Sequence, residues 1–120
     1  MKALFDTNIL IDYLNGVEAA RDELGRYDGV AISVVTWMEV MIGADPEGVD
    51  AVRRFLSGFE IISADERVAE VAVDLRRRHR IKLPDAIVWA SARSSGMLLV
   101  SRNTKDFPAD DPGVREPYRL

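Results

Sequence analysis

The chain carries five polar side chains close behind predicted strands or at the start of a predicted helix. They are Asp6, Glu39, Asp85, Asn103 and Asp106. Carboxylate and amide oxygens gathered without histidine or cysteine are the ligands that Mg²⁺ prefers, and Mn²⁺ fits the same set. Like charges in one pocket repel each other and raise their proton affinity until a cation relieves the repulsion. A cation held in this way activates water and offsets charge at phosphorus, which is the chemistry of phosphodiester hydrolysis.

The composition narrows the chemistry further. Cysteine is absent and the only histidine is His79, which excludes thiolate zinc sites, disulfides, cysteine nucleophiles and any site built on paired imidazoles. The paired-histidine arrangement that cuts RNA through its own 2′-hydroxyl is excluded with them. The net charge of −4 argues against diffuse nucleic-acid binding and leaves a local basic patch open.

Length and hydrophobicity indicate the overall organisation. With 120 residues, 48% of them hydrophobic, the chain is expected to be one globular domain, residues 1–120. No signal peptide or membrane span is apparent, so the expected compartment is the cytoplasm.

Short apolar runs alternate with helical patterns along the chain. The predicted strands cover 2–5, 30–34 and 97–101, with a brief β-type run at 59–63. The predicted helices cover 8–15, 17–27, 36–44, 48–58, 65–80 and 85–95. This alternation predicts an α/β fold with three α/β/α layers and a mainly parallel sheet. Because such folds bind ligands at the carboxyl ends of their strands, we expect the five polar side chains to converge at one edge of the sheet.

Each candidate also has a purely structural interpretation. Thr36 and Glu39 have the spacing of a capping box, and the spacing alone does not separate this role from a catalytic one. Asp6 taken singly is explained more simply as the cap of the following helix. Asn103 and Asp106 fit tight turns after a strand. Their joint occurrence at the ends of neighbouring elements favours a shared site.

Basic residues were considered as contacts for a phosphate backbone. Arg102 and Lys105 flank Asn103 and are the candidates for substrate phosphate. The run Arg76–Arg80 fits a helix C-terminus, where cations complement the helix dipole, although an RNA-backbone role remains open.

Several other side chains are expected to have structural roles. His79, Trp37 and Trp89 are expected in packing or, for the tryptophans, in a dimer interface. The remaining acids are expected on solvated faces, namely Asp12, Glu18, Glu23, Glu47, Glu70 and Asp74.

Four motifs in order resemble a PIN-domain ribonuclease, specifically a VapC-type toxin of bacterial or archaeal toxin–antitoxin modules. They are FDTNILIDYLNG, ISVVTWMEVMIGA, LPDAIVWASA and LLVSRNTKDF. The resemblance covers essentially the whole chain. It implies that Asp6, Glu39 and Asp85 are metal-binding catalytic acids. Asn103 falls where many relatives carry a fourth acid and others carry Asn, and Asp106 is the acid of the closing Asp-Phe.

The resemblance also implies dependence on Mg²⁺ or Mn²⁺, RNA cleavage that leaves a 5′-phosphate, a homodimer, and inhibition by a cognate VapB-like antitoxin. Two other classes of protein share some of these features. A phosphoacceptor signalling domain is disfavoured because that family opens with adjacent acids after its first strand, and this chain has only Asp6 there. A non-catalytic PIN-like module that binds RNA or protein is supported by Asn103 and opposed by the three retained acids.

Overall fold

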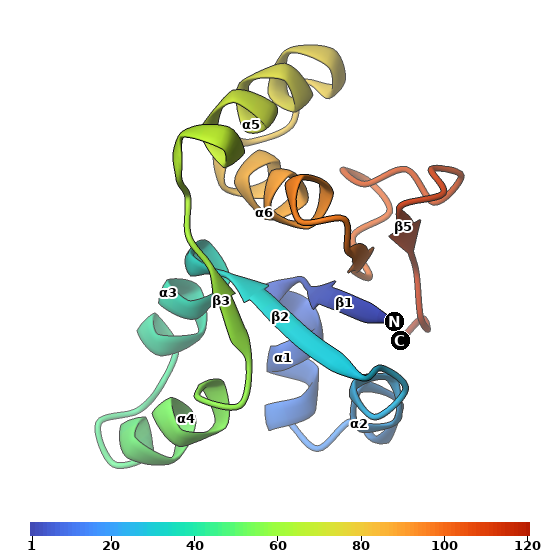
Figure 1. The fold of residues 1–120 in the computed structure, drawn as a ribbon. Helices are drawn as coiled ribbons and strands as arrows, with labels where there is room; N and C mark the ends of the chain where they lie inside the picture. Colours follow the sequence, from blue (N-terminus) through green and yellow to red (C-terminus); the bar gives the residue numbers. More distant parts are fainter.

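A computed structural model describes residues 1–120 and contains one five-stranded sheet in the order β3-β2-β1-β4-β5 (Figure 1). The strands are β1 (Lys2–Phe5), β2 (Gly29–Ser33), β3 (Glu60–Ile62), β4 (Leu98–Val100) and β5 (Val114–Arg115). Every neighbouring pair is parallel. The predicted parallel sheet is therefore confirmed, and β5 is an additional edge strand that the sequence did not reveal.

Six helices cover both faces of this sheet. They are α1 (Thr7–Leu14), α2 (Glu18–Leu24), α3 (Val34–Ile42), α4 (Val49–Leu56), α5 (Glu66–His79) and α6 (Leu83–Ser94). Figure 1 shows α5 and α6 above one face, and α1 to α4 below the other. The predicted three-layer α/β/α architecture is confirmed.

Side chains alternate between two cores along the strands. Leu4 packs with α5 and α6, whereas its neighbours Ala3 and Phe5 pack with α1 to α4. Strands covered on both faces carry continuous apolar residues, which explains why β1 reads as an unbroken hydrophobic run. Trp89 of α6 is 2% exposed, and its ring centroid lies 4.7 Å from that of His79. The expected core packing of Trp89 is confirmed, whereas His79 is exposed and packs through its ring against Trp89.

The beginnings of three helices determine which side chains reach the carboxyl edge of the sheet. Asp6 caps α1 and accepts a hydrogen bond from the Thr7 N–H. Ser33 caps α3 and accepts one from the Val35 N–H, so Thr36 lies inside α3 and is fully buried. The capping-box interpretation of Thr36 and Glu39 is therefore wrong.

Two acids expected in solvent are buried instead. Asp12 is 5% exposed and Glu23 is 4% exposed. Asp12 pairs with Arg102, and Glu23 pairs with Arg115 of β5. The expectation failed because both partners come from the last quarter of the chain, about 90 residues away, where helical spacing gives no signal. No helix has the length and apolar character needed to cross a membrane.

Candidate active site

The carboxyl ends of β1, β2 and β4 lie side by side because β1 is the central strand of the sheet. The chain leaves β1 through helices on one face to reach β2, and returns from β3 to β4 through α5 and α6 on the other face. The order of the strands reverses at β1, and such switch points leave a crevice at the carboxyl edge. The first turn of α6 contributes Asp85 to the same crevice.

The crevice is a cavity of about 380 Å³ whose lining is polar apart from one side chain. It is lined by Asp6, Thr7, Asn8, Ile11, Asp12, Glu39, Asp85, Arg102 and Asn103. The structure therefore brings together four of the five predicted residues, and Arg102 with them. Asp106 and Lys105 do not line the cavity, although the charge of Asp106 acts on both Asp6 and Asp85.

Asp6 is held rigidly at the bottom of the site. It is 5% exposed, and its Oδ2 accepts hydrogen bonds from Ser101 Oγ at 2.7 Å and Asn8 Nδ2 at 3.2 Å. Burial raises the pKa of Asp6, and the hydrogen bonds from Ser101 and Thr7 oppose that shift. The charges of Glu39 and Asp106 raise it further. A buried carboxylate facing other acids is a position where a cation is stabilising.

Glu39 and Asp85 face the cavity from α3 and α6. Glu39 is exposed, and its Oε1 accepts a hydrogen bond of 2.7 Å from Thr7 Oγ1. Burial raises the pKa of Asp85 to about 6, helped by the charges of Asp6, Asp106 and Glu39 and by a hydrogen bond with Asp106. The charges of neighbouring acids thus act on both Asp6 and Asp85.

Asn103 combines a turn with a place in the cavity lining. Its Nδ2 donates to Asp106 Oδ2 at 3.0 Å, and its Oδ1 accepts from the Asp106 N–H at 3.3 Å. The turn interpretation of these two residues is confirmed by this geometry. Asn103 lines the cavity as well as forming this turn.

Three polar residues of the site were missed as functional candidates. Thr7, Asn8 and Ser101 hold the carboxylates of Asp6 or Glu39. The signal available in the sequence was the unbroken polar run Asp-Thr-Asn directly after β1. Nothing local marked Ser101, because its partner Asp6 is 95 residues away.

The residues present fit a hard divalent cation by their chemistry. The acidic side chains offer only oxygen ligands. Burial, and after it the charges of neighbouring acids, raise the pKa values of Asp6 and Asp85, and a bound cation would lower them. No group of three or more acidic, His or Cys side chains is arranged to hold a metal ion by itself. Mg²⁺ often binds through one or two carboxylates and keeps several waters, so not every acid of this cavity would need to contact it.

A second cavity, of about 340 Å³, lies at the opposite end of the sheet beside Met1, Met97 and Leu98. Its charged residues, Arg93 and Asp111, form an ion pair of 3.4 Å with each other. The first cavity instead gathers Asp6, Glu39 and Asp85, and it is therefore the candidate active site.

The fold and this acidic edge define a class of protein. A family model described as the PIN domain matches residues 3–109, and the chain belongs to the PIN domain family. Among curated proteins, it is 38% identical over 113 residues to ribonuclease VapC10 of Mycobacterium tuberculosis, covering 88% of this chain and 85% of that one. It is 30% identical over 119 residues to the tRNA(fMet)-specific endonuclease VapC of Shigella flexneri, covering 89% and 90%.

A solved structure supports the same assignment. The chain superposes on a chain of a toxin–antitoxin complex from Klebsiella pneumoniae with a TM-score of 0.93 and 47% identity, covering 98% of this chain and 99% of that one. Within the PIN family, the chain is therefore of the VapC ribonuclease type.

Proposed function

We propose that this protein is an endoribonuclease that depends on Mg²⁺ or Mn²⁺ and acts as the toxin of a toxin–antitoxin pair, with residues 1–120 forming one PIN domain. The observation that carries the proposal is that Asp6, Glu39 and Asp85 line one cavity at the carboxyl edge of the sheet. Water-excluding burial of Asp6 and the mutual repulsion of the acids suit a site that works with a cation and a phosphate.

The roles of the residues follow from their positions. Asp6, Glu39 and Asp85 would hold the cation, with Asn103 and Asp106 beside them. When bound, the cation lowers the pKa of a coordinated water and offsets negative charge on the phosphate. Ser101 and Asn8 orient Asp6, and Thr7 orients Glu39, so that the carboxylates need little rearrangement.

Substrate phosphates need a cationic side chain beside the acids. Lys105 is exposed and makes no ion pair, so its ammonium group is free to contact RNA near Asp106. The chain as a whole carries a charge of −4, which makes such local contacts more important for RNA binding.

The proposed partners follow from a similar solved structure and from the surface. The Klebsiella protein, 47% identical, was solved as a toxin–antitoxin complex, and a VapB-like antitoxin is the partner we propose for this chain. We also propose a homodimer. Met38 and Ile42 of α3 are 46% and 83% exposed, and Leu83 is 50% exposed, which leaves apolar surface for a partner to cover.

The test is to incubate the purified protein with total RNA, with Mg²⁺ and with a chelator. We expect fragments only when Mg²⁺ is present, and none from Asp6→Asn under either condition. Binding of RNA without any cleavage in Mg²⁺ or Mn²⁺ would contradict the proposal and favour the non-catalytic binding module.

A further inference from the structure

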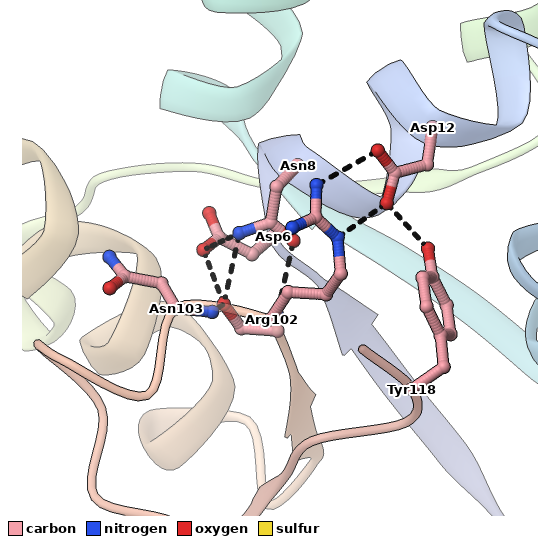
Figure 2. A network of polar contacts seen from close by, with 7 residues as sticks. Asp6, Asn8, Asp12, Arg102, Asn103 and Tyr118 are labelled. Carbon is pink, nitrogen blue, oxygen red and sulfur yellow. Dashed lines mark hydrogen bonds and ion pairs between the residues drawn. The ribbon is translucent and has the colours of Figure 1, made fainter. Parts of the chain in front are cut away.

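The side chain of Arg102 is held by Asp12, which is 90 residues away in the sequence, and Tyr118 bonds Asp12 in turn (Figure 2). Its Nε and Nη2 donate to the two carboxylate oxygens of Asp12 at 2.6 and 2.9 Å. Tyr118 lies in the C-terminal segment, residues 116–120 after β5, and donates its hydroxyl to Asp12 Oδ2 at 2.7 Å. Asp12 is thus a buried carboxylate shared by an arginine fork and a tyrosine, and burial of its charge is compensated on both oxygens.

The hydrogen bonds of Arg102 extend from Asp12 to the acidic cavity. The backbone N–H of Arg102 donates to Asn8 Oδ1 at 3.2 Å, and the Asn8 amide donates to Asp6 Oδ2. The preceding residue, Ser101, donates its hydroxyl to the same oxygen of Asp6. Figure 2 shows these contacts as one continuous network from Tyr118 to Asp6. Movement of Arg102 would therefore change two of the bonds that orient Asp6.

The same contacts argue against Arg102 as a phosphate ligand. A guanidinium binds phosphate strongly when its fork presents two parallel N–H groups. In this structure that fork is occupied by Asp12, which also neutralises the charge of Arg102. The side chain of Arg102 is 28% exposed, so it lines the cavity without presenting its fork to it.

We propose that Arg102, held by Asp12, which Tyr118 of the C-terminal segment also bonds, is a positioning residue that fixes Ser101 and Asn8 around the Asp6 carboxylate. This inference rests on the proposed function. It assigns the C-terminal segment a role in the reaction without contact with the substrate, and it replaces the expectation that Arg102 binds substrate phosphate.

The molecule contains a matched control for this proposal. Arg115 donates from Nε and Nη2 to both oxygens of Glu23 at 2.7 and 3.1 Å, and Tyr27 donates to Glu23 Oε2 at 2.7 Å. This second arginine–carboxylate–tyrosine group also fastens the C-terminal part of the chain to a helix. Its residues do not line the acidic cavity. The Arg115 carbonyl accepts a hydrogen bond from the Ser101 N–H, but this backbone contact stays in place when only the side chain of Arg115 is changed. Equivalent side-chain substitutions in the two groups should therefore disturb the fold similarly and differ in what they do to Asp6.

The first test compares Arg102→Lys with Arg115→Lys, since lysine keeps the charge and loses the bidentate fork. Both variants should show a similar decrease in Tm. We expect Arg102→Lys to lower kcat for RNA cleavage about 10-fold with KM little changed, and to weaken Mn²⁺ binding measured by calorimetry. Arg115→Lys should retain the wild-type kcat and Mn²⁺ affinity.

The second test compares Tyr118→Phe with Tyr27→Phe, which are milder and preserve both ion pairs. Tyr118→Phe should lower kcat in the same direction as Arg102→Lys, and the double variant should be little worse than Arg102→Lys alone because both changes act through one network. Hydrogen exchange of the Arg102 amide, which bonds Asn8, should be faster in Tyr118→Phe than in Tyr27→Phe.

Two results would overturn the inference while leaving the proposed function intact. The first is that the wild-type protein cleaves RNA and that, within each pair of compared variants, both variants have the same kcat and the same Mn²⁺ affinity. The other is an Arg102→Lys or Arg102→Gln variant with raised KM, unchanged kcat and a salt dependence of KM reduced by about one phosphate contact, which is the behaviour of a phosphate ligand. A wild-type protein that never cleaves RNA contradicts the proposed function instead. In that case Mn²⁺ affinity and Arg102 amide exchange still decide whether the network positions Asp6.

Discussion

The hydroxyl of Thr7 donates a 2.7 Å hydrogen bond to Oε1 of Glu39 and joins the first residue of α1 to the middle of α3. The same hydroxyl lies 3.0 Å from Thr36 Oγ1, which is buried beneath it. Thr7 also donates its N–H to Asp6. One residue therefore sets the relative position of two candidate metal-binding acids that are more than thirty residues apart in sequence.

Glu39→Gln separates the charge of this side chain from its hydrogen bond. The Gln oxygen still accepts from Thr7 and the side chain is exposed, so we expect a change in unfolding free energy below about 0.5 kcal/mol. The loss of a carboxylate beside the cation should reduce RNA cleavage by about 100-fold. Glu47→Gln, another exposed acid, is the control. A large loss of Tm with wild-type cleavage would identify Glu39 as a structural residue only.

Asp85→Asn tests the repulsion inside the cavity. Burial and the charges of Asp6, Asp106 and Glu39 raise the pKa of Asp85 to about 6, so its charge destabilises the metal-free protein at neutral pH. Removing the charge should stabilise that form by about 1 kcal/mol after allowance for solvent screening, and should abolish most cleavage. Melting curves in chelator and a cleavage assay measure the two effects. Cleavage at the wild-type rate would leave Asp85 as a helix-start residue.

The pKa shifts of the cavity acids also predict how the stability of the metal-free protein depends on pH. The raised pKa values of Asp6 and Asp85 mean that the folded state takes up protons more readily, so stability should increase as the pH falls from about 7 to about 5. The pKa shifts of Asp12 and Glu23 have the opposite sign and therefore the opposite effect on stability. Burial raises their pKa values, but hydrogen bonds from Arg102, Tyr118, Arg115 and Tyr27 outweigh it and hold both values low.

Stability from these two ion pairs should be lost as the pH falls below about 4, since the ordinary values are 3.8 and 4.5. We therefore expect Tm in chelator to reach its maximum near pH 5, and the rise between pH 7 and pH 5 to shrink in Asp85→Asn. A Tm that falls steadily from pH 7 downward would contradict the assignment of mutual repulsion to the cavity.

Asn103→Asp tests the effect of having Asn at the position where many relatives carry a fourth acid. The Asn amide donates to Asp106 Oδ2 at 3.0 Å, and an aspartate there would lose this donor and face Asp106 with like charge. Metal-free Tm should fall, and Mn²⁺ should bind more tightly because attraction to the cation gains a formal charge. Calorimetric titration and melting curves with and without Mn²⁺ measure both effects. Unchanged affinity together with unchanged metal-free Tm would exclude Asn103 from the site.

Much of the fold was predictable because strands and helices produce local patterns of apolar and polar residues in the sequence. The run Lys2–Phe5 is predicted and observed with the same bounds, and the parallel order places Asp6 beside Ser101 through the pairing of Phe5 with Val100. Strand β5 was missed because it has only two residues and depends on pairing with β4. A strand that short has no periodicity to read.

The convergence of Asp6, Glu39 and Asp85 was also predictable, since strand ends and a helix start determine it. The network of hydrogen bonds and ion pairs that supports these acids was not predictable. Asp12 and Glu23 look like solvated helix residues, and only the return of the C-terminal segment brings Arg102, Tyr118 and Arg115 onto them. Long-range ion pairs leave no spacing in the sequence, and so the expected solvent exposure of both acids was wrong.

The chemistry of the RNA ends tests the account most directly. Attack of water on phosphorus with departure of the 3′ oxygen leaves a 5′-phosphate and a 3′-hydroxyl, whereas attack by the RNA 2′-hydroxyl with departure of the 5′ oxygen leaves a cyclic phosphate and a 5′-hydroxyl. We expect the wild-type protein in Mg²⁺ to produce only 5′-phosphate ends, mapped by ligation that requires that group, and to produce no cuts after chelation. Fragments with 5′-hydroxyl ends, or cleavage that persists in chelator and in Asp6→Asn, would contradict a hydrolytic site built on these carboxylates.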